Sequence, residues 1–273
     1  MKVYTHVDVD LDNASSVALA LLKYNKLTLN DIIFVSGNFD GKEMVGNDIA
    51  LDIEAGGKGE KGNVISVDGR IRVLSAFSLF LGSMDTEYQD AFEDLSIFID
   101  AIDSTGTWAL GYDLDGVDTL ASLPTLEQVF FAVKHQFKDD LTVTMFWSKI
   151  IQGFWKRHKS DLRASTEATK AKWPYERIAI MSDSSEPTTM GRLFRQGADF
   201  VIYENGYNLG VKRSNALDID LSYYLKDMLP DWFHHKAGFL SCWGSKKAPQ
   251  TAPTYISAEK LADMVSTIKY NRN

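Results

Sequence analysis

The chain of 273 residues is 45% apolar, 12% aromatic and 24% charged, which is typical of a soluble globular protein with one large domain or two smaller ones. This composition excludes intrinsic disorder, collagen-like repeats and small disulfide-stabilised folds, and the single cysteine, Cys242, cannot form an intrachain disulfide. The net charge of -8 excludes a uniformly basic surface that coats nucleic acid. The first residues lack a signal-peptide pattern and no apolar run reaches the roughly 20 residues of a membrane span, so we expect a cytoplasmic protein without a membrane partner.

The charge is divided unequally along the chain. Residues 1–140 carry 10 Lys and Arg against 24 Asp and Glu, a balance of -14, whereas residues 141–273 carry 19 against 13, a balance of +6. Two ordinary solvated surfaces account for this division. A second interpretation is an acidic half that collects divalent cations and a basic half that holds a phosphate-bearing substrate.

Residues 1–140 are expected to form the first domain, an α/β unit with a parallel sheet. Its short apolar runs are typical of strands covered on both faces, and its longer periodic segments are typical of helices. Asp12 or Asn13 is placed to cap the first helix. The expected strands are 2–7, 31–36 and 48–53, and the expected helices are 14–24, 74–81 and 87–102.

A helical connector is expected over residues 141–175, because Trp173-Pro174 interrupts the helical pattern there. Residues 176–273 are expected to form a smaller mixed-sheet α/β domain that faces the first domain across a cleft. The Asn205-Gly206 pair predicts a hairpin between two of its strands. The expected strands are 177–182, 200–204, 209–213 and 238–243, and the expected helices are 218–228 and 257–268.

The end of the first expected strand carries one histidine and three aspartates within seven residues: His6, Asp8, Asp10 and Asp12. In an extended segment all four side chains point to one face, at the sheet edge where α/β proteins bind ligands. Three like charges repel one another, and a hard cation such as Mn²⁺ or Mg²⁺ offsets that repulsion. Solvated acids on an edge strand, or an acidic helix cap, are the alternatives; they explain Asp12 alone better than the whole set.

The run from His6 to Ser16 resembles motif I of the DHH phosphoesterase superfamily, which includes RecJ-type exonucleases, NrnA-type oligoribonucleases, cyclic-dinucleotide phosphodiesterases and family II inorganic pyrophosphatases. One form of the motif, His-x-x-x-Asp-x-Asp, is met by His6, Asp10 and Asp12. The other, Asp-x-Asp-x-Asp-Gly, is met by Asp8, Asp10 and Asp12, with Asn13 in place of the glycine.

Later segments resemble two further motifs of that superfamily. Asp52, after the apolar run 49–51, looks like the metal-bridging aspartate of motif II, and Asp103, a better candidate than Asp100, looks like the aspartate of motif IV. The resemblance implies one or two Mn²⁺ (or Mg²⁺) ions held by His6, Asp8, Asp10, Asp12, Asp52 and Asp103. It also implies catalytic roles for Asp10, Asp12, Asp52 and Asp103.

Motif III, the Asp-His-His sequence, is the departure from the family pattern. It occurs nowhere in the chain; Asp68, which no histidine directly follows, is the aspartate that comes nearest to it. In the family its first histidine binds one metal and its second contacts phosphate, so the number of metals and the hydrolytic activity both stay open. One ion is still expected at His6, Asp10 and Asp52.

A second resemblance lies in the expected C-terminal domain. Segments 210–214 and 232–239 are similar to the DHH-associated domain, in which a strand ending in Arg-Ser and a Gly-Gly-His loop bind phosphates or bases. The resemblance implies that Arg213, His234 and His235 bind substrate. An ordinary surface arginine is the alternative for Arg213, and at most one of the adjacent histidines is expected to be functional. One of them crossing the cleft to replace the missing motif III ligand is a further option.

The sequence therefore predicts a metal-dependent phosphoesterase that hydrolyses a phosphodiester in a small nucleotide or a short single-stranded oligonucleotide. A DHH-fold protein that binds nucleotides with weakened or no turnover is the first alternative. A structural cation site in an α/β protein of another function is the second. Pairing of the chain into a homodimer stays open.

Overall fold

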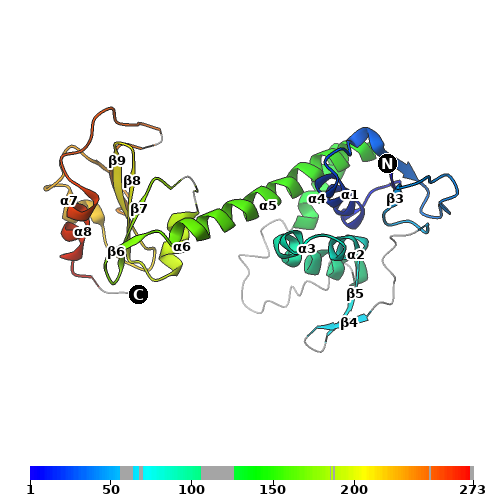
Figure 1. Cartoon of the computed structure of the whole chain (residues 1–273), viewed down its shortest axis with the longest axis horizontal. Helices are drawn as coiled ribbons and strands as arrows, with labels where there is room; N and C mark the ends of the chain where they lie inside the picture. Colours follow the sequence, from blue (N-terminus) through cyan, green and yellow to red (C-terminus); the bar gives the residue numbers. More distant parts are fainter. Residues whose placement is uncertain are drawn as a thin grey trace. The chain divides into compact units, whose positions relative to one another are not determined.

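The computed structural model describes residues 1–55, 64–67, 70–105, 126–184, 186, 188–245 and 247–270 (Figure 1). Asp68 lies outside the described residues. The chain divides into two compact units, Met1–Arg157 and His158–Asn273. The expected α/β class, with a parallel sheet in the first unit and a mixed sheet in the second, is confirmed. Within the described ranges no helix has the length and apolar character needed to cross a bilayer.

The first unit is built on a small parallel sheet with β1 at its centre. The strand order is β2-β1-β3, and the elements that form it are β1 (Val3–His6), α1 (Leu11–Lys23), a 3₁₀ turn (Leu29–Asp31), β2 (Ile32–Val35) and β3 (Ile49–Ala50). The chain passes through α1 to pair β2 on one side of β1, and then returns to pair β3 on the other side. α/β proteins bind ligands at the carboxyl ends of the strands beside such a reversal of strand order.

Helices complete the core of the first unit. Trp147 and Phe130 are fully buried against each other with ring centroids 5.1 Å apart, and the indole Nε1–H of Trp147 donates to Ser15 Oγ at 2.7 Å. Phe77 and Phe92 extend the same cluster. The remaining elements are an antiparallel hairpin of β4 (Val64–Val67) and β5 (Arg70–Val73), and the helices α2 (Ala76–Gly82), α3 (Thr86–Thr105), α4 (Leu126–Gln136) and α5 (Asp140–Ala168).

The segment expected as a connector contributes to both units instead. The boundary between the units falls between Arg157 and His158, inside α5. Val143 and Trp147, from the first half of α5, belong to the core of the first unit, whereas Ala168 packs in the second. Apolar residues at helical spacing are found both in connecting helices and in helices that pack in a core. The sequence does not distinguish the two, because the residues against which such a helix packs are distant in the chain.

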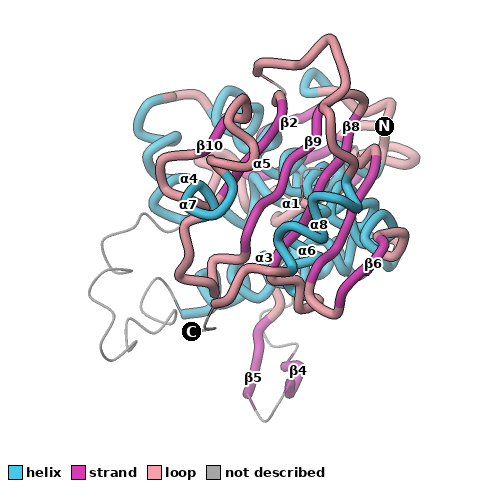
Figure 2. The backbone as a smooth tube through the Cα atoms, turned by 90° about the vertical axis from the view of Figure 1, so that its left-hand side faces the viewer, coloured by secondary structure: helices cyan, strands magenta, loops and turns pink. Residues whose placement is uncertain are grey.

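The second unit is a six-stranded mixed sheet with the order β10-β11-β9-β8-β7-β6, of which Figure 2 labels β10, β9, β8 and β6. Strands β7 and β8 are parallel. Helix α6 lies on one face and α7 and α8 lie on the other (Figure 1). The elements are β6 (Lys172–Tyr175), β7 (Ile178–Ser182), α6 (Thr189–Arg195), β8 (Phe200–Asn205), β9 (Asn208–Arg213), α7 (Leu221–Leu225), β10 (Phe233–His234), β11 (Leu240–Trp243) and α8 (Ala258–Ser266).

One expectation for this unit is confirmed and two boundaries differ. The expected hairpin after Asn205 is present, and Gly206 adopts a positive φ of 57° in its turn. Helix α7 begins later than the expected residue 218 because Asp220 caps it, accepting from Ser222 N at 2.8 Å, and it ends earlier than expected, at Leu225. Pro174, which was expected to end a helical connector, lies in β6, an edge strand where a missing N–H costs no ladder bond.

Candidate metal centre

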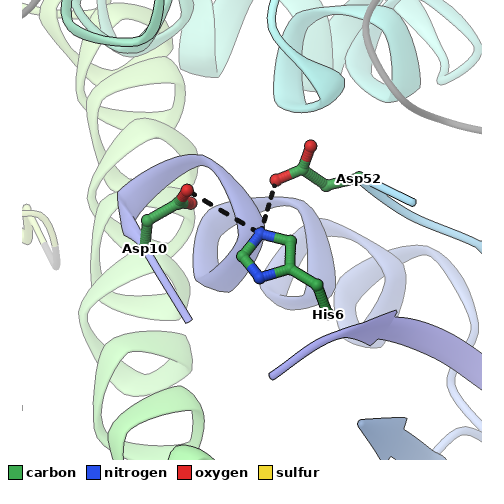
Figure 3. A group of neighbouring side chains, drawn as sticks. All are labelled: His6, Asp10 and Asp52. Carbon is green, nitrogen blue, oxygen red and sulfur yellow. Dashed lines mark hydrogen bonds and ion pairs between the residues drawn. The ribbon is translucent and has the colours of Figure 1, made fainter. Parts of the chain in front are cut away.

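Three side chains converge at the carboxyl edge of the parallel sheet (Figure 3). His6 Nε2 lies 2.9 Å from Asp52 Oδ2 and 3.7 Å from Asp10 Oδ2. Each residue offers one ligand atom, and all three atoms lie within 4.8 Å of one another. Among the described residues this is the one such group of three or more histidine, cysteine or acidic side chains.

The sheet and the first helix bring these residues together. His6 is the last residue of β1, and Asp52 comes two positions after the end of β3, which pairs with β1 in parallel. Asp10 is the N-cap of α1, and its Oδ1 accepts from Asn13 N at 2.9 Å. Parallel strands end at the same edge, so two of the ligands come from strand ends and the third from the helix that follows β1.

The expectation that His6, Asp8, Asp10 and Asp12 share one face of an extended strand is wrong. The strand ends at His6 and α1 begins at Leu11, so a turn and the start of a helix separate the four residues. Asp8 interrupts the extended backbone with a φ of 58°. The expected cap, Asp12 or Asn13, is also wrong, because Asp10 has the extended backbone and the side-chain bond of an N-cap.

The charges of the site favour a cation at its centre. The hydrogen bond to Asp52 raises the pKa of His6 from its ordinary value to about 9, so the imidazole holds its proton at neutral pH. Loss of hydration raises the pKa of Asp10, and the negative charge of Asp52 adds to this. In the absence of a metal the His6 imidazolium is therefore the positive charge between two carboxylates.

The residues present fit a hard divalent ion. One imidazole and two carboxylates are a donor set suited to Mn²⁺. An octahedral ion with ligands about 2.1 Å away separates adjacent ligand atoms by about 3 Å and opposite ones by about 4.2 Å. The distances of 2.9 and 3.7 Å from His6 Nε2 lie close to this range. Binding requires the loss of the His6 proton, so metal and proton compete for the same nitrogen.

Asp12 has a different environment from the three converging residues. It is buried, and its carboxylate accepts from Ala76 N at 2.9 Å and Phe77 N at 2.7 Å, at the start of α2. Burial raises its pKa well above the usual range. The start of α2 is thus anchored on Asp12 by two hydrogen bonds.

The other predicted acidic ligands also lie outside the converging group. Asp8 is 86% exposed at its side chain, and the ammonium of Lys134, 2.7 Å from its Oδ1, lowers its pKa. Asp103 lies on α3 with an exposed side chain. Asp100 is the buried acid of that helix, and its Oδ1 accepts from the N–H and hydroxyl of Ser75. The structure thus brings together three of the six predicted ligands.

The three predicted substrate-binding residues of the second unit are engaged within their own fold. Arg213 donates to the carbonyls of Ser214 and Leu217 at 3.0 and 2.6 Å. His234 bridges Ser241 Oγ at 2.9 Å and the Leu229 carbonyl at 3.0 Å. The ring Nδ1 of His235 accepts from Ala237 N at 3.1 Å. Their substrate-binding role stays a prediction.

Two residues that the sequence reasoning missed hold the turn beside the site. Lys134 of α4 pairs with Asp8, and the carboxylate of Asp140 accepts from the backbone N–H groups of Asp8 and Val9. The pair Asp139-Asp140 before an apolar periodic segment indicates a helix start. No pattern in the sequence says that one of the two reaches the β1–α1 turn, more than 130 residues away.

The second unit contains a cavity of about 330 Å³ on the face of the sheet opposite α7 and α8. Lys212 borders it, and its ammonium lies 5.5 Å from the ring centroid of Phe239. Neighbouring residues of a strand point to opposite faces, so Lys212 faces away from the side on which Arg213 lies. Its other walls include Met181, Met190, Tyr203 and Leu240.

Comparisons with known proteins gave weak structural similarities. A scan against family models and a search of curated proteins found no match. The chain is similar to an uncharacterized protein from Helicobacter pylori G27 (14% identity, TM-score 0.25, covering 98% of this chain and 100% of that chain). It is also similar to the pGpG-specific phosphodiesterase PggH from Vibrio cholerae (12% identity, TM-score 0.26, covering 88% of this chain and 91% of that chain). A third similarity is to exonuclease RecJ bound to manganese (11% identity, TM-score 0.29, covering 91% of this chain and 86% of that chain). Scores this low do not establish a shared fold.

Proposed function

We propose that this chain is a divalent-metal-dependent phosphoesterase whose ion is held by His6, Asp10 and Asp52. The observation that carries the proposal is the convergence of these three ligand atoms within 4.8 Å at the carboxyl edge of the parallel sheet. It is supported by the reversal of strand order at β1, since α/β proteins bind ligands at the carboxyl edge beside such a reversal. The resemblance of residues 6–16 to a phosphoesterase motif supports the same reaction class.

The roles of the chain's own groups follow from their positions. His6 Nε2 and the carboxylates of Asp10 and Asp52 provide the ligands, and the cap position of Asp10 fixes its carboxylate at the start of α1. A divalent ion supplies positive charge to phosphoryl oxygens and acidifies water. The ammonium of Lys134 lies close enough to act on the charge of Asp10, although its ion pair with Asp8 offsets most of its own charge.

The substrate class in this proposal is a phosphodiester in a small nucleotide or a short single-stranded oligonucleotide. The net charge of -8 disfavours long duplexes, which repel an acidic protein. The positive balance of +6 over residues 141–273, from 19 Lys and Arg against 13 Asp and Glu, suits contacts with a short anionic ligand. Mn²⁺ or Mg²⁺ is the proposed ion, because the donors are oxygen and imidazole.

Hydrolysis of a linear dinucleotide with Mn²⁺ or Mg²⁺ tests this function. Asp10→Asn is the decisive variant, since asparagine caps a helix as well as aspartate and α1 is expected to keep its fold. We expect loss of metal-dependent hydrolysis in Asp10→Asn and full activity in Asp220→Asn, the same change at the cap of α7. Equal hydrolysis by Asp10→Asn and the wild type would rule the proposal out.

A second candidate function is nucleotide binding without turnover. It is favoured by the cavity of about 330 Å³ bordered by Lys212 and Phe239, which offers an aromatic face and a cation independently of the candidate metal centre. It also agrees with the absence of Asp-His-His from the sequence. Nucleotide binding that persists in Asp10→Asn and is lost in Lys212→Met, with no hydrolysis by the wild type, would favour this function.

A further inference from the structure

We propose that Asp140 is a positioning residue for the candidate metal centre, because its carboxylate holds the turn between β1 and α1 in the conformation that brings His6 and Asp10 together. The inference rests on the proposed metal-binding function. It assigns a role to a residue of α5 that is far in sequence from the turn. Ligands on a turn need such support, because a loop by itself holds side chains less well than a helix or strand does.

The contact is made by both oxygens of one carboxylate. Asp140 Oδ2 accepts from the N–H of Asp8 at 2.8 Å, and Oδ1 accepts from the N–H of Val9 at 3.0 Å. Hydrogen bonds to an ionised carboxylate are stronger than those between neutral groups, and two of them fix an orientation. Asp140 therefore fixes two consecutive peptide planes between the ligands His6 and Asp10.

The backbone at this turn needs outside support. Asp8 has a φ of 58°, in the left-handed region where a non-glycine residue is strained. Lys134 forms a second contact with the turn, an ion pair in which its Nζ lies 2.7 Å from Asp8 Oδ1. Because Asp8 is exposed at its side chain, that ion pair stabilises the turn only weakly. The two bonds to Asp140 act on the backbone of the turn itself, at Asp8 and at the next residue, Val9.

The helix that carries Asp140, α5, is anchored by buried side chains. Val143 and Trp147, on the next two turns of α5, are buried in the core of the first unit. The neighbouring acid, Asp139, performs the ordinary capping role, as its Oδ1 accepts from Thr142 N at 2.8 Å. Asp140 is therefore free to reach the β1–α1 turn. The two adjacent aspartates have separate roles, which provides a matched control.

Mn²⁺ titration of the full chain by calorimetry tests the assignment. Asp140→Asn keeps the size of the side chain but replaces one acceptor by an amide that faces an N–H. We expect Mn²⁺ affinity to fall about 10- to 100-fold, the range for loss of a group that supports a ligand. Asp139→Asn is expected to bind Mn²⁺ within about twofold of the wild type, because asparagine still caps α5. Equal affinities for the two variants would overturn the proposal.

A rescue variant separates positioning from general destabilisation. Glycine adopts a positive φ without strain, so adding Asp8→Gly to Asp140→Asn is expected to restore part of the lost affinity. Recovery of Mn²⁺ affinity without a matching rise of the urea midpoint supports the positioning role, whereas no recovery together with a lowered urea midpoint would overturn it.

The result for the wild type distinguishes this inference from the proposed function. If the wild type binds no Mn²⁺, the proposed function itself fails. Amide hydrogen exchange in the metal-free protein then reports on the turn alone. We expect the N–H groups of Asp8 and Val9 to exchange at least 10-fold faster in Asp140→Asn than in Asp139→Asn, and equal rates would show that Asp140 does not hold the turn.

Discussion

The imidazole Nε2 of His6 lies 2.9 Å from Oδ2 of Asp52, although the two residues are 46 positions apart. Parallel pairing of β1 with β3 places both at the carboxyl edge of one sheet. The contact joins the first and the last of the three candidate ligands in the sequence, and Asp10, at the start of α1, is the third.

Asp52→Asn is expected to weaken Mn²⁺ binding at least about 10-fold, because the amide keeps the shape of the side chain and loses its charge. Asp48 lies at the opposite, amino end of β3 and accepts from Lys2 N at 2.8 Å. Asp48→Asn is therefore the matched control, and its Mn²⁺ affinity is expected to equal that of the wild type. Calorimetric titration measures both; equal weakening in the two variants would contradict a site at Asp52.

The metal-free protein is expected to lose stability as the pH rises from about 7 to 9. The folded-state pKa of His6 is raised to about 9 by Asp52, above the unfolded value of 6.5, so the contribution is fully present below pH 6.5 and is lost as the pH passes through 9. Its upper limit is on the order of 3 kcal/mol, from about 1.4 kcal/mol per unit of pKa shift. Urea unfolding in EDTA from pH 6 to 10 measures it. The same series on Asp52→Asn is expected to show little of this slope.

Asp12→Asn is expected to destabilise the first unit by about 1 to 3 kcal/mol. The amide accepts one of the two hydrogen bonds from Ala76 and Phe77 and presents N–H groups to the other donor. Urea unfolding measures the change. Mn²⁺ affinity is expected to change less than in Asp52→Asn, since Asp12 lies outside the converging group. Loss of binding in a folded Asp12→Asn protein would instead support the metal role that the sequence predicts.

His234→Phe is expected to destabilise the second unit by about 1 to 3 kcal/mol, because the ring bridges Ser241 Oγ and the Leu229 carbonyl. Ser241 is buried and would lose that partner. The unfolding transition of the second unit, followed in urea, measures this. His235→Phe is the comparison, since the acceptor bond of His235 is to a local N–H. Nucleotide affinity lost in His234→Phe without loss of stability would favour a substrate role.

The sequence alone was sufficient for the class of fold. Alternating apolar runs and helical periods predict the α/β architecture, and Asn205-Gly206 predicts the hairpin that the structure contains. These features depend on local backbone preferences and on which face is apolar, both of which can be read from neighbouring residues. His6, Asp10 and Asp52 were also named from the sequence, through chemistry and a family resemblance.

Only the tertiary structure decided which acids meet. The sequence gives Asp8, Asp10 and Asp12 the same spacing and chemistry, yet Asp8 pairs with Lys134 and Asp12 anchors α2. That difference depends on where β1 ends and on α2, α4 and α5, which come from positions more than 60 residues away. Hydrogen-bond partners at such distances leave no local pattern in the sequence. A candidate metal ligand such as Asp10, a helix anchor such as Asp12 and an ion-paired turn residue such as Asp8 therefore cannot be told apart before the chain has folded.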